Sequence, residues 1–339
     1  MKIKKKINLG IVGKNFGYNV IYKSFQKNKN FKIVGFSFKS KINYSIKISK
    51  KIKIYSSWKK LILNKSIDAI AIASPPTSHK NIIKFAIKNK KHIFCEKPFT
   101  CSFNEANYIC KLIKQKKLSH IVNYEFVEID AFQIFKNNIL NKKNKIDKIK
   151  IDWFLNIKRK KNTWKEYHSK GGGIMFNYAC HAIYYLEFFF GKIISTKSLI
   201  SYKNKKSINA INSNIFFKSG LSAELKVKIL SKNSKDKPIH QVKVRSNKKI
   251  YLLRSFLNSL TNQFEIIKIT KNKNQCLFKN KNSKIDFRIK PSFRNSKKFS
   301  SWILNNKIQN PNFFDAKRIH FIIDQMILSS KERKKIYIN

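Results

Sequence analysis

The first part of the chain alternates short apolar runs with longer segments in which apolar residues recur every three or four positions. The short runs, rich in branched side chains, lie at residues 8–12, 31–38, 53–55, 68–73, 92–95 and 120–126. Such runs are typical of strands buried on both faces of a parallel sheet. The segments with helical spacing lie at 20–25, 57–63, 77–87 and 102–116. Strand and helix thus alternate, which predicts a doubly wound α/β domain over residues 1–122.

The pattern changes beyond Asn123. Long alternating runs, in which every second residue is apolar, lie at 149–157, 211–217, 221–229 and 239–244. This period indicates extended antiparallel strands with one buried face and few intervening helices. We therefore expect a second domain over residues 123–339, of α+β class, with a mainly antiparallel open sheet and a final helix that can pack back on the first domain.

The carboxyl ends of two neighbouring predicted strands carry proline and polar residues. Ser74-Pro75-Pro76 ends one strand and Glu96-Lys97-Pro98 ends the next. In open parallel sheets, ligands bind at this edge, and Pro98 would fix the turn that holds Lys97 there. For Glu96 and Lys97 the alternative is an ordinary surface ion pair. The residues that we expect to line the edge are Ser74, Pro75, Pro76, His79, Glu96 and Lys97.

A glycine turn, Gly13-Lys14-Asn15-Phe16-Gly17, follows the first predicted strand. Glycine lets the backbone turn tightly and approach a pyrophosphate, whose charge is met by backbone donors at the start of the next helix. Asn15, which tolerates positive φ, replaces the usual middle glycine, and Gly17 lies one residue short of the usual third. Gly13, Asn15, Phe16 and Gly17 are therefore candidate dinucleotide-binding residues, and a plain strand-to-helix turn is the alternative.

The end of the second predicted strand bears on the choice of dinucleotide. An acidic residue there would favour NAD, but the strand is followed by Lys39-Ser40-Lys41. A cation and a hydroxyl group suit a 2′-phosphate, so Lys39 indicates a preference for NADP over NAD. The alternative is that Lys39 is one more surface lysine.

In the second predicted domain, three glycines precede a long apolar helix. Gly171-Gly172-Gly173 allows close approach of the backbone to a ligand. Asn177 and His181, four residues apart, are expected to share one face of the helix. They are candidate catalytic residues, and the alternative for His181 is a core histidine whose hydrogen bonds are satisfied.

The charge of the chain is strongly positive, with 74 basic and 17 acidic residues and a formal net charge of +57. Such an excess ordinarily indicates binding to nucleic acid. Here only seven of the basic residues are arginine, the residue that makes bidentate base contacts, and the 67 lysines are spread over the whole length. This distribution indicates a compositional bias, and we expect no specific nucleic-acid partner, only salt-sensitive adhesion to polyanions.

Several further features concern the compartment. No apolar run is long enough to span a bilayer, and the basic start passes directly into a strand, which leaves no room for the apolar core of a signal peptide. The five cysteines are odd in number and show no CxxC spacing, so we expect neither disulfides nor a metal site. These features predict a cytoplasmic protein without a membrane partner.

The order of the motifs resembles the glucose-fructose oxidoreductase and inositol dehydrogenase family, often called Gfo/Idh/MocA. The motifs are the glycine turn, A-S-P-P-T-S-H, C-E-K-P-F, G-G-G with N-Y-A-C-H, and a final helix over 315–330. The resemblance covers essentially the whole chain. It implies a Rossmann domain that holds NAD or NADP and a C-terminal α/β domain whose sheet covers the nicotinamide and often forms a dimer interface, so a homodimer or homotetramer is expected.

The resemblance also implies a chemistry, the reversible oxidation of a hydroxyl group on a sugar, a cyclitol or a nucleotide sugar. Lys97 would hydrogen-bond the reacting oxygen, and His181 would exchange its proton. The sequence departs from the family pattern at Asn15, Val127, Asn177 and Tyr184, and Asn177 cannot titrate, so it could only orient substrate or His181. These departures leave open an alternative, a cofactor-binding homologue with little or no turnover.

Overall fold

The computed structural model describes residues 6–38, 48–140, 145–157, 163–204, 207–231, 233–255, 263–280 and 285–338. The chain forms two compact units. The first unit consists of Met1–Glu125 and Arg288–Arg318, and the second of Phe126–Phe287 and Ile319–Asn339. The chain therefore leaves the first unit after Glu125 and returns to it at Arg288.

The first unit contains a parallel sheet with the strand order β3-β2-β1-β4-β5-β6. The strands are β1 (Ile7–Val12), β2 (Phe31–Ser37), β3 (Lys53–Tyr55), β4 (Ala69–Ile72), β5 (His92–Cys95) and β6 (His120–Val122). This order, which starts in the middle and winds outward both ways, confirms the predicted doubly wound fold. The prediction was wrong in extending the last strand to Phe126. The chain instead enters a 3-10 helix, η2 (Glu125–Glu128), which buries Phe126 and Val127 without a strand.

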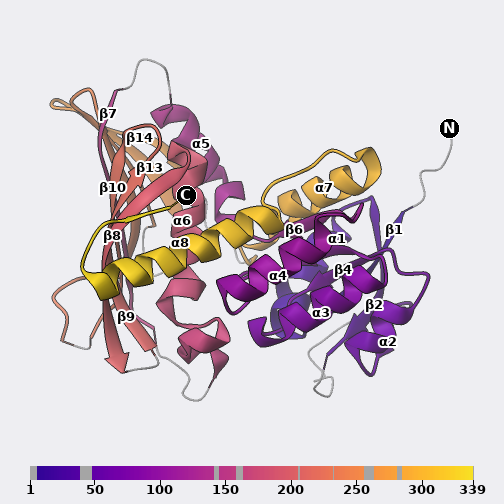
Figure 1. Ribbon diagram of the computed structural model, residues 1–339. Helices are drawn as coiled ribbons and strands as arrows, with labels where there is room; N and C mark the ends of the chain where they lie inside the picture. The colour runs from indigo at the N-terminus through magenta and orange to yellow at the C-terminus, as the bar shows by residue number, and fades with distance from the viewer. Residues whose placement is uncertain are drawn as a thin grey trace. The chain divides into compact units, whose positions relative to one another are not determined.

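Helices cover both faces of this sheet (Figure 1). They are η1 (Gly17–Tyr22), α1 (Lys23–Gln26), α2 (Trp58–Leu63), α3 (Pro76–Lys88), α4 (Phe103–Ile113) and α7 (Ile289–Asn305). Helix α3 packs between α2 and α4, whereas η1 and α1 pack against α7. Ser102 caps α4 by accepting from the N–H of Glu105 at 3.3 Å. The Glu105 carboxylate in turn accepts from the N–H of Cys101 at 3.1 Å.

Helix α7, which the apolar pattern does not reveal, completes the core of the first unit. Its Phe299 ring lies 5.8 Å from that of Phe31 on β2 and 5.9 Å from that of Phe94 on β5. The helix escapes prediction because half of its buried face is polar: Ser292, Asn295, Ser296 and Ser300 are all fully buried. The core of the first unit therefore depends on a segment that comes after residues 126–287 of the second unit in the sequence.

The second unit is built on a mixed sheet with the order β14-β13-β12-β11-β7-β10-β9-β8-β15 among the described residues. The strands are β7 (Ile146–Leu155), β8 (Ile193–Asn204), β9 (Ser207–Phe217), β10 (Ser222–Ile229), β11 (Ile239–Ser246), β12 (Lys249–Ser255), β13 (Phe264–Ile269), β14 (Asn274–Lys279) and β15 (Ile336–Tyr337). Only the β7–β10 pair in this part of the structure is parallel. The predicted mainly antiparallel sheet is confirmed.

The helices of the second unit are α5 (Asp130–Ile139) and α6 (Cys180–Phe190), together with short turns η3 (Trp164–Glu166), η4 (His168–Lys170) and η5 (Met175–Ala179). Helix α5 packs on β12, β13 and β14. The last helix, α8 (Phe313–Glu332), begins in the first unit and continues into the second. Its Ser329 accepts from the N–H of Ser198 on β8 at 2.9 Å, which fixes the end of the helix on the sheet.

Candidate functional site

Four parallel strands of the first unit end side by side and form one edge. Val12, Ile72, Cys95 and Val122 are in register across β1, β4, β5 and β6. The ladder continues one residue further. Ala73 donates its N–H to the carbonyl oxygen of Val12 at 2.7 Å, Glu96 to that of Ile72 at 2.8 Å, and Asn123 to that of Cys95 at 2.8 Å. We call the segments that follow these four strands, Gly13–Gly17, Ser74–Pro76, Glu96–Lys97 and Asn123–Glu125, the carboxyl edge. The predicted residues Gly13, Ser74, Glu96 and Lys97 therefore lie on neighbouring strand ends.

The glycine turn packs directly on the end of β4. Gly13 has a φ of 122°, and a Cβ atom at this position would overlap the carbonyl group of Ala73. Its N–H donates to the carbonyl oxygen of Ser37 at 2.9 Å. By contrast, a Cβ atom on Gly17 would make an ordinary contact of 3.6 Å. The chain's own packing therefore requires glycine at 13, whereas at 17 a methyl group has room. Of the other predicted turn residues, Asn15 is exposed and Phe16 is half-buried.

The end of β4 is held by a buried histidine. Pro75 is exposed and Pro76 opens α3. His79 on α3 is fully buried, with Nε2 at 2.8 Å from the carbonyl oxygen of Ser74 and Nδ1 at 3.1 Å from that of Pro98. Burial lowers the pKa of His79, which favours the neutral ring. His79 thus joins the ends of β4 and β5 and shapes the edge through the backbone that it holds.

Glu96 is a buried carboxyl group with an amide partner, 6% exposed. Its Oε1 accepts from Asn123 Nδ2 at 2.6 Å, and the same amide nitrogen lies 2.9 Å from Ser292 Oγ on α7. Burial, and then the negative charge of Glu125, raise the pKa of Glu96 to about 8, against the opposing effects of Asn123, Lys97 and Arg288. Glu96 is therefore mostly protonated at neutral pH, and its side chain is buried, whereas the neighbouring Lys97 is half-buried.

The predicted residues of the second unit lie where a wide π-helical turn, η5, leads into α6. His181 is 2% exposed, and its ring centre lies 4.6 Å from that of Phe126 and 6.4 Å from that of Trp153. Asn177 is half-buried and donates its amide to the carbonyl oxygen of Gly173 at 2.9 Å. Of the preceding glycines, Gly172 serves the chain's own packing, because a Cβ atom at this position would overlap the backbone of Trp164.

The remaining candidates are placed as follows. Lys39 lies outside the described residues. Val127 is 2% exposed and Tyr184 is half-buried. Lys97 belongs to the first unit and His181 to the second. Sequence reasoning missed Asn123, Glu125 and Arg288. A signal for Asn123 existed, because pairing the predicted strands at 92–95 and 120–126 places it beside Glu96.

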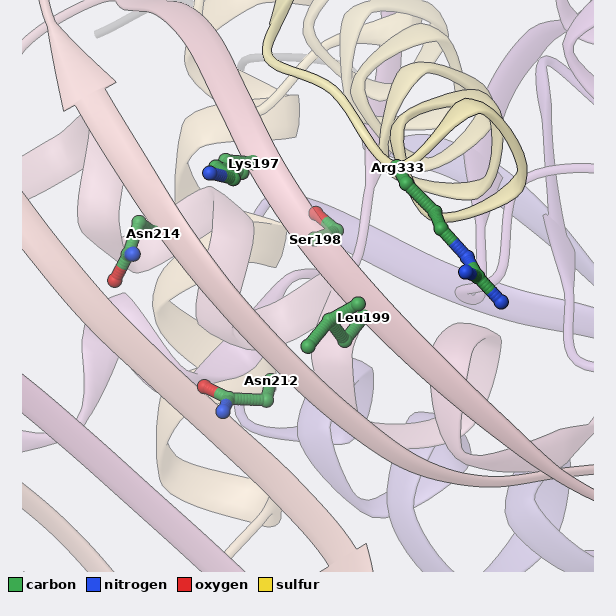
Figure 2. Close-up of a pocket in the computed structure, with 6 residues that line it drawn as sticks. All are labelled: Lys197, Ser198, Leu199, Asn212, Asn214 and Arg333. Carbon is green, nitrogen blue, oxygen red and sulfur yellow. The ribbon is translucent and has the colours of Figure 1, made fainter.

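A hollow of about 160 Å³ lies in the second unit, and none of the residues that line it is a predicted site residue. Figure 2 shows its lining, which comes from β8, β9 and the turn after α8: Lys197, Ser198, Leu199, Asn212, Asn214 and Arg333. Within the described ranges no cluster of three or more His, Cys, Asp or Glu residues could hold a metal ion. None of the helices in the described part of the chain is long and apolar enough to cross a membrane.

Comparison with known proteins identifies the family. Residues 7–124 match the model described as "Oxidoreductase family, NAD-binding Rossmann fold", and residues 141–276 match "Oxidoreductase family, C-terminal alpha/beta domain". The chain belongs to the Gfo/Idh/MocA oxidoreductase family. The resemblance inferred from the motifs, with its Rossmann domain and its C-terminal α/β domain, is thereby confirmed.

Curated relatives of this family member are distant. An uncharacterised oxidoreductase of Synechocystis is 26% identical over 204 residues, which cover 58% of this chain and 54% of the relative. The 2,7-anhydro-N-acetylneuraminate hydratase of Escherichia coli is 26% identical over 149 residues, which cover 43% of this chain and 39% of the relative. The chain thus matches about half or less of the length of these relatives.

Solved structures show the same fold over almost the whole chain. A levoglucosan dehydrogenase in complex with NADH has a TM-score of 0.81 at 14% identity, covering 99% of this chain and 100% of that one. An oxidoreductase domain protein from Kribbella flavida has a TM-score of 0.82 at 12% identity, with coverage of 99% and 100%. At these identities the similarity establishes the fold alone.

Proposed function

We propose that this protein is an NAD(P)-dependent oxidoreductase that transfers a hydride between nicotinamide and a hydroxyl or carbonyl group of a sugar, a cyclitol or a nucleotide sugar. The observation that carries the proposal is the carboxyl edge of a family Rossmann sheet, where the glycine turn, Ser74 and Lys97 lie on adjacent strand ends. In the direction of oxidation, a secondary alcohol and NAD(P)⁺ give a ketone, NAD(P)H and a proton.

The turn after β1 fits a dinucleotide by its own geometry. Gly13 brings the backbone tightly against β4, and the turn opens a helix whose first N–H groups suit an anion. Gly13, Asn15, Phe16 and Gly17 would hold the pyrophosphate, and Ser74, Pro75, Pro76 and Glu96 would line the path toward the nicotinamide. The nicotinamide, when bound, accepts or returns the hydride. Lys39 would select NADP by pairing with the 2′-phosphate.

Lys97 would act on the reacting oxygen. Loss of hydride from a carbinol leaves negative charge on that oxygen, which an ammonium group stabilises. Glu96 beside it is neutral for the most part at pH 7, so this carboxyl group adds little negative charge next to the oxygen on which negative charge develops. The turn at Pro98, held by His79, fixes the backbone that carries Lys97.

His181 would exchange the hydroxyl proton. A positioned histidine contributes roughly 10²- to 10⁴-fold to such reactions. Its aromatic surroundings, Phe126 and Trp153, restrict the ring. Lys97 and His181 belong to different units, so the proposal requires that both reach one substrate oxygen. Asn177 would orient the substrate or His181 and takes no part in proton transfer.

Two observations favour a second candidate, a cofactor-binding homologue with little or no turnover. Val127, where many family members have arginine, is an apolar side chain only 2% exposed. The amide of Asn177, a position that is often aspartate, is engaged by its own helix start. Both candidates predict binding of NADPH or NADH. They differ in turnover alone.

The experiment that separates these functions is a fluorescence titration with NADPH and NADH, followed by a panel of sugars, inositols and nucleotide sugars. Lys97→Ala is expected to lower kcat by at least about 10²-fold while the cofactor Kd stays within about twofold. Lys88→Ala, an exposed lysine at the end of α3, is the matched control and keeps full activity. Lys39→Asp is expected to weaken the binding of NADPH more than the binding of NADH.

Three outcomes decide between the proposals. Turnover that disappears only in the Lys97 variant supports the oxidoreductase. Cofactor binding without turnover on any substrate supports the second candidate, the cofactor-binding homologue. Failure of the wild-type protein to bind either dinucleotide refutes both.

The proposal extends to assembly and compartment: we infer a homodimer or homotetramer that acts in the cytoplasm. Large apolar side chains stand exposed on the sheet of the second unit, with Leu199 62%, Tyr202 51% and Tyr337 66% exposed. Such clusters on a surface commonly mark protein contacts. Light scattering of the purified protein tests this, and a mass of one chain at micromolar concentration would contradict it.

A further inference from the structure

Helix α7 places an arginine against the glycine turn. Arg288 immediately precedes the helix, and its guanidinium carbon lies 5.0 Å from the centre of the Phe16 ring. Phe16 belongs to the turn that follows β1. A guanidinium group over an aromatic face is attracted by the ring electrons. This contact therefore keeps the positive charge of Arg288 beside the turn.

Two buried hydrogen bonds fix the start of α7 in this place. Ser24 Oγ, on the helix that follows the glycine turn, lies 3.0 Å from the carbonyl oxygen of Ile289. Ser292 Oγ accepts from the amide of Asn123, which follows β6. Both serines are fully buried. The backbone that directly follows Arg288 is thus anchored to α1 and to the segment after β6.

The charge of Arg288 is felt at the carboxyl edge as well as at the turn. It opposes the rise in the pKa of the buried Glu96 carboxyl, so the guanidinium lies within electrostatic reach of the end of β5. The group is half-buried, a setting in which its charge is screened less than on an open surface. A cation in this position faces the strand ends where a doubly wound sheet binds the phosphates of its ligand.

The turn itself offers less to a pyrophosphate than a turn with three glycines. Asn15 carries a side chain where the backbone would approach the phosphates, and the turn's own cation, Lys14, is a point charge. An arginine fork supplies several donors in one plane and binds phosphate oxygens in pairs. Arginine is also scarce here, with seven residues among 74 basic ones, so its presence at this position is not explained by the lysine-rich composition.

We propose that Arg288 binds the pyrophosphate of the dinucleotide, so that the cofactor site of the first unit is completed by a residue from beyond the second unit. This inference rests on the proposed dinucleotide binding. It assigns to α7 a role in ligand affinity in addition to its role in the core.

The test compares three ligands on the full chain. NADH is titrated by fluorescence, ADP-ribose by calorimetry, and adenosine by competition with NADH. Arg288→Gln is expected to raise the Kd of NADH and of ADP-ribose about tenfold and to leave that of adenosine unchanged, because adenosine lacks the pyrophosphate. Arg288→Lys, which keeps the charge and loses the fork, is expected to give a smaller increase and guards against a folding defect in the glutamine variant.

Lys297→Gln is the matched control. It removes one positive charge from the same helix and breaks a similar pair, Lys297 Nζ over Phe293 at 5.7 Å, but it lies about two and a half turns further along. Its Kd values are expected to equal those of the wild type. Equal binding by Arg288→Gln and wild type overturns the inference, and so does an equal loss for adenosine, which would indicate a distorted turn. If the wild-type protein binds neither NADH nor NADPH, the proposed function itself fails.

Discussion

Glu96→Gln is expected to remove much of the loss of stability that the first unit suffers at alkaline pH. Glutamine resembles the protonated acid and can still accept the bond from Asn123 Nδ2. The pKa of Glu96 is about 8 in the folded protein and 4.5 in an unperturbed carboxyl group. Below pH 4.5 both folded and unfolded chains hold the proton. Between pH 4.5 and about 8 only the folded chain does, so stability falls as the pH rises, and above that range the loss is complete.

The magnitude follows from the same two values. Each pH unit in which only the folded state holds the proton costs about 1.4 kcal/mol, so the full range corresponds to about 5 kcal/mol. Between pH 6 and pH 9 the free energy of unfolding of the wild-type protein should fall by about 3 kcal/mol more than that of the Glu96→Gln variant. This is a large share of the roughly 5–15 kcal/mol by which a domain is stable.

The assay is urea denaturation at pH 6, 7.5 and 9, followed by tryptophan fluorescence, with Trp58 on α2 and Trp302 on α7 as the reporters within the first unit. Hydrogen exchange of peptides from β5 and β6 assigns the change to that unit. Glu332→Gln, which removes an exposed carboxylate at the end of α8, is expected to follow the wild-type profile. If wild type and Glu96→Gln lose stability in parallel between pH 6 and 9, Glu96 does not lose its proton in that range and the reasoning is refuted.

Two further predictions concern backbone conformation. Gly13→Ala should destabilise the first unit by several kcal/mol, because the new Cβ atom would overlap the Ala73 carbonyl group. Gly17→Ala has room for a methyl group, so this variant should melt within about 2 °C of the wild type. Similar melting temperatures for the two variants would contradict this. Lys90→Gly should stabilise the protein by up to about 1 kcal/mol in the same assay. Lys90 lies two residues beyond the end of α3 and has a φ of 55°, a conformation that glycine adopts freely; a lower melting temperature would contradict this.

The parts of the fold that the sequence predicts are those where a local pattern agrees with the tertiary structure. The strands at 53–55 and 92–95 have the predicted bounds, since each is a short apolar run closed by turn residues. The strand at 120 ends four residues early because Phe126 and Val127 are buried by a 3-10 helix, and apolar character alone does not distinguish these two forms of burial.

The site was predictable only in part, for a physical reason. Gly13, Ser74 and Lys97 directly follow strands, so the rule for parallel sheets locates them from the sequence. Arg288 and Ser292 reach the same edge through α7, whose buried face is too polar to show an apolar period. Their contribution depends on contacts between segments far apart in the chain, and no local pattern encodes such contacts.

The return of α7 to the first unit has a consequence for the order of events during synthesis. Phe31 and Phe94 leave the ribosome long before Phe299, the ring that covers both. At about 5–20 residues per second, the first unit waits roughly 10 to 40 seconds for its last helix. During that interval a nascent chain exposes an aromatic surface that chaperones would recognise. A fragment that stops at Glu125 would retain this surface permanently and is expected to aggregate.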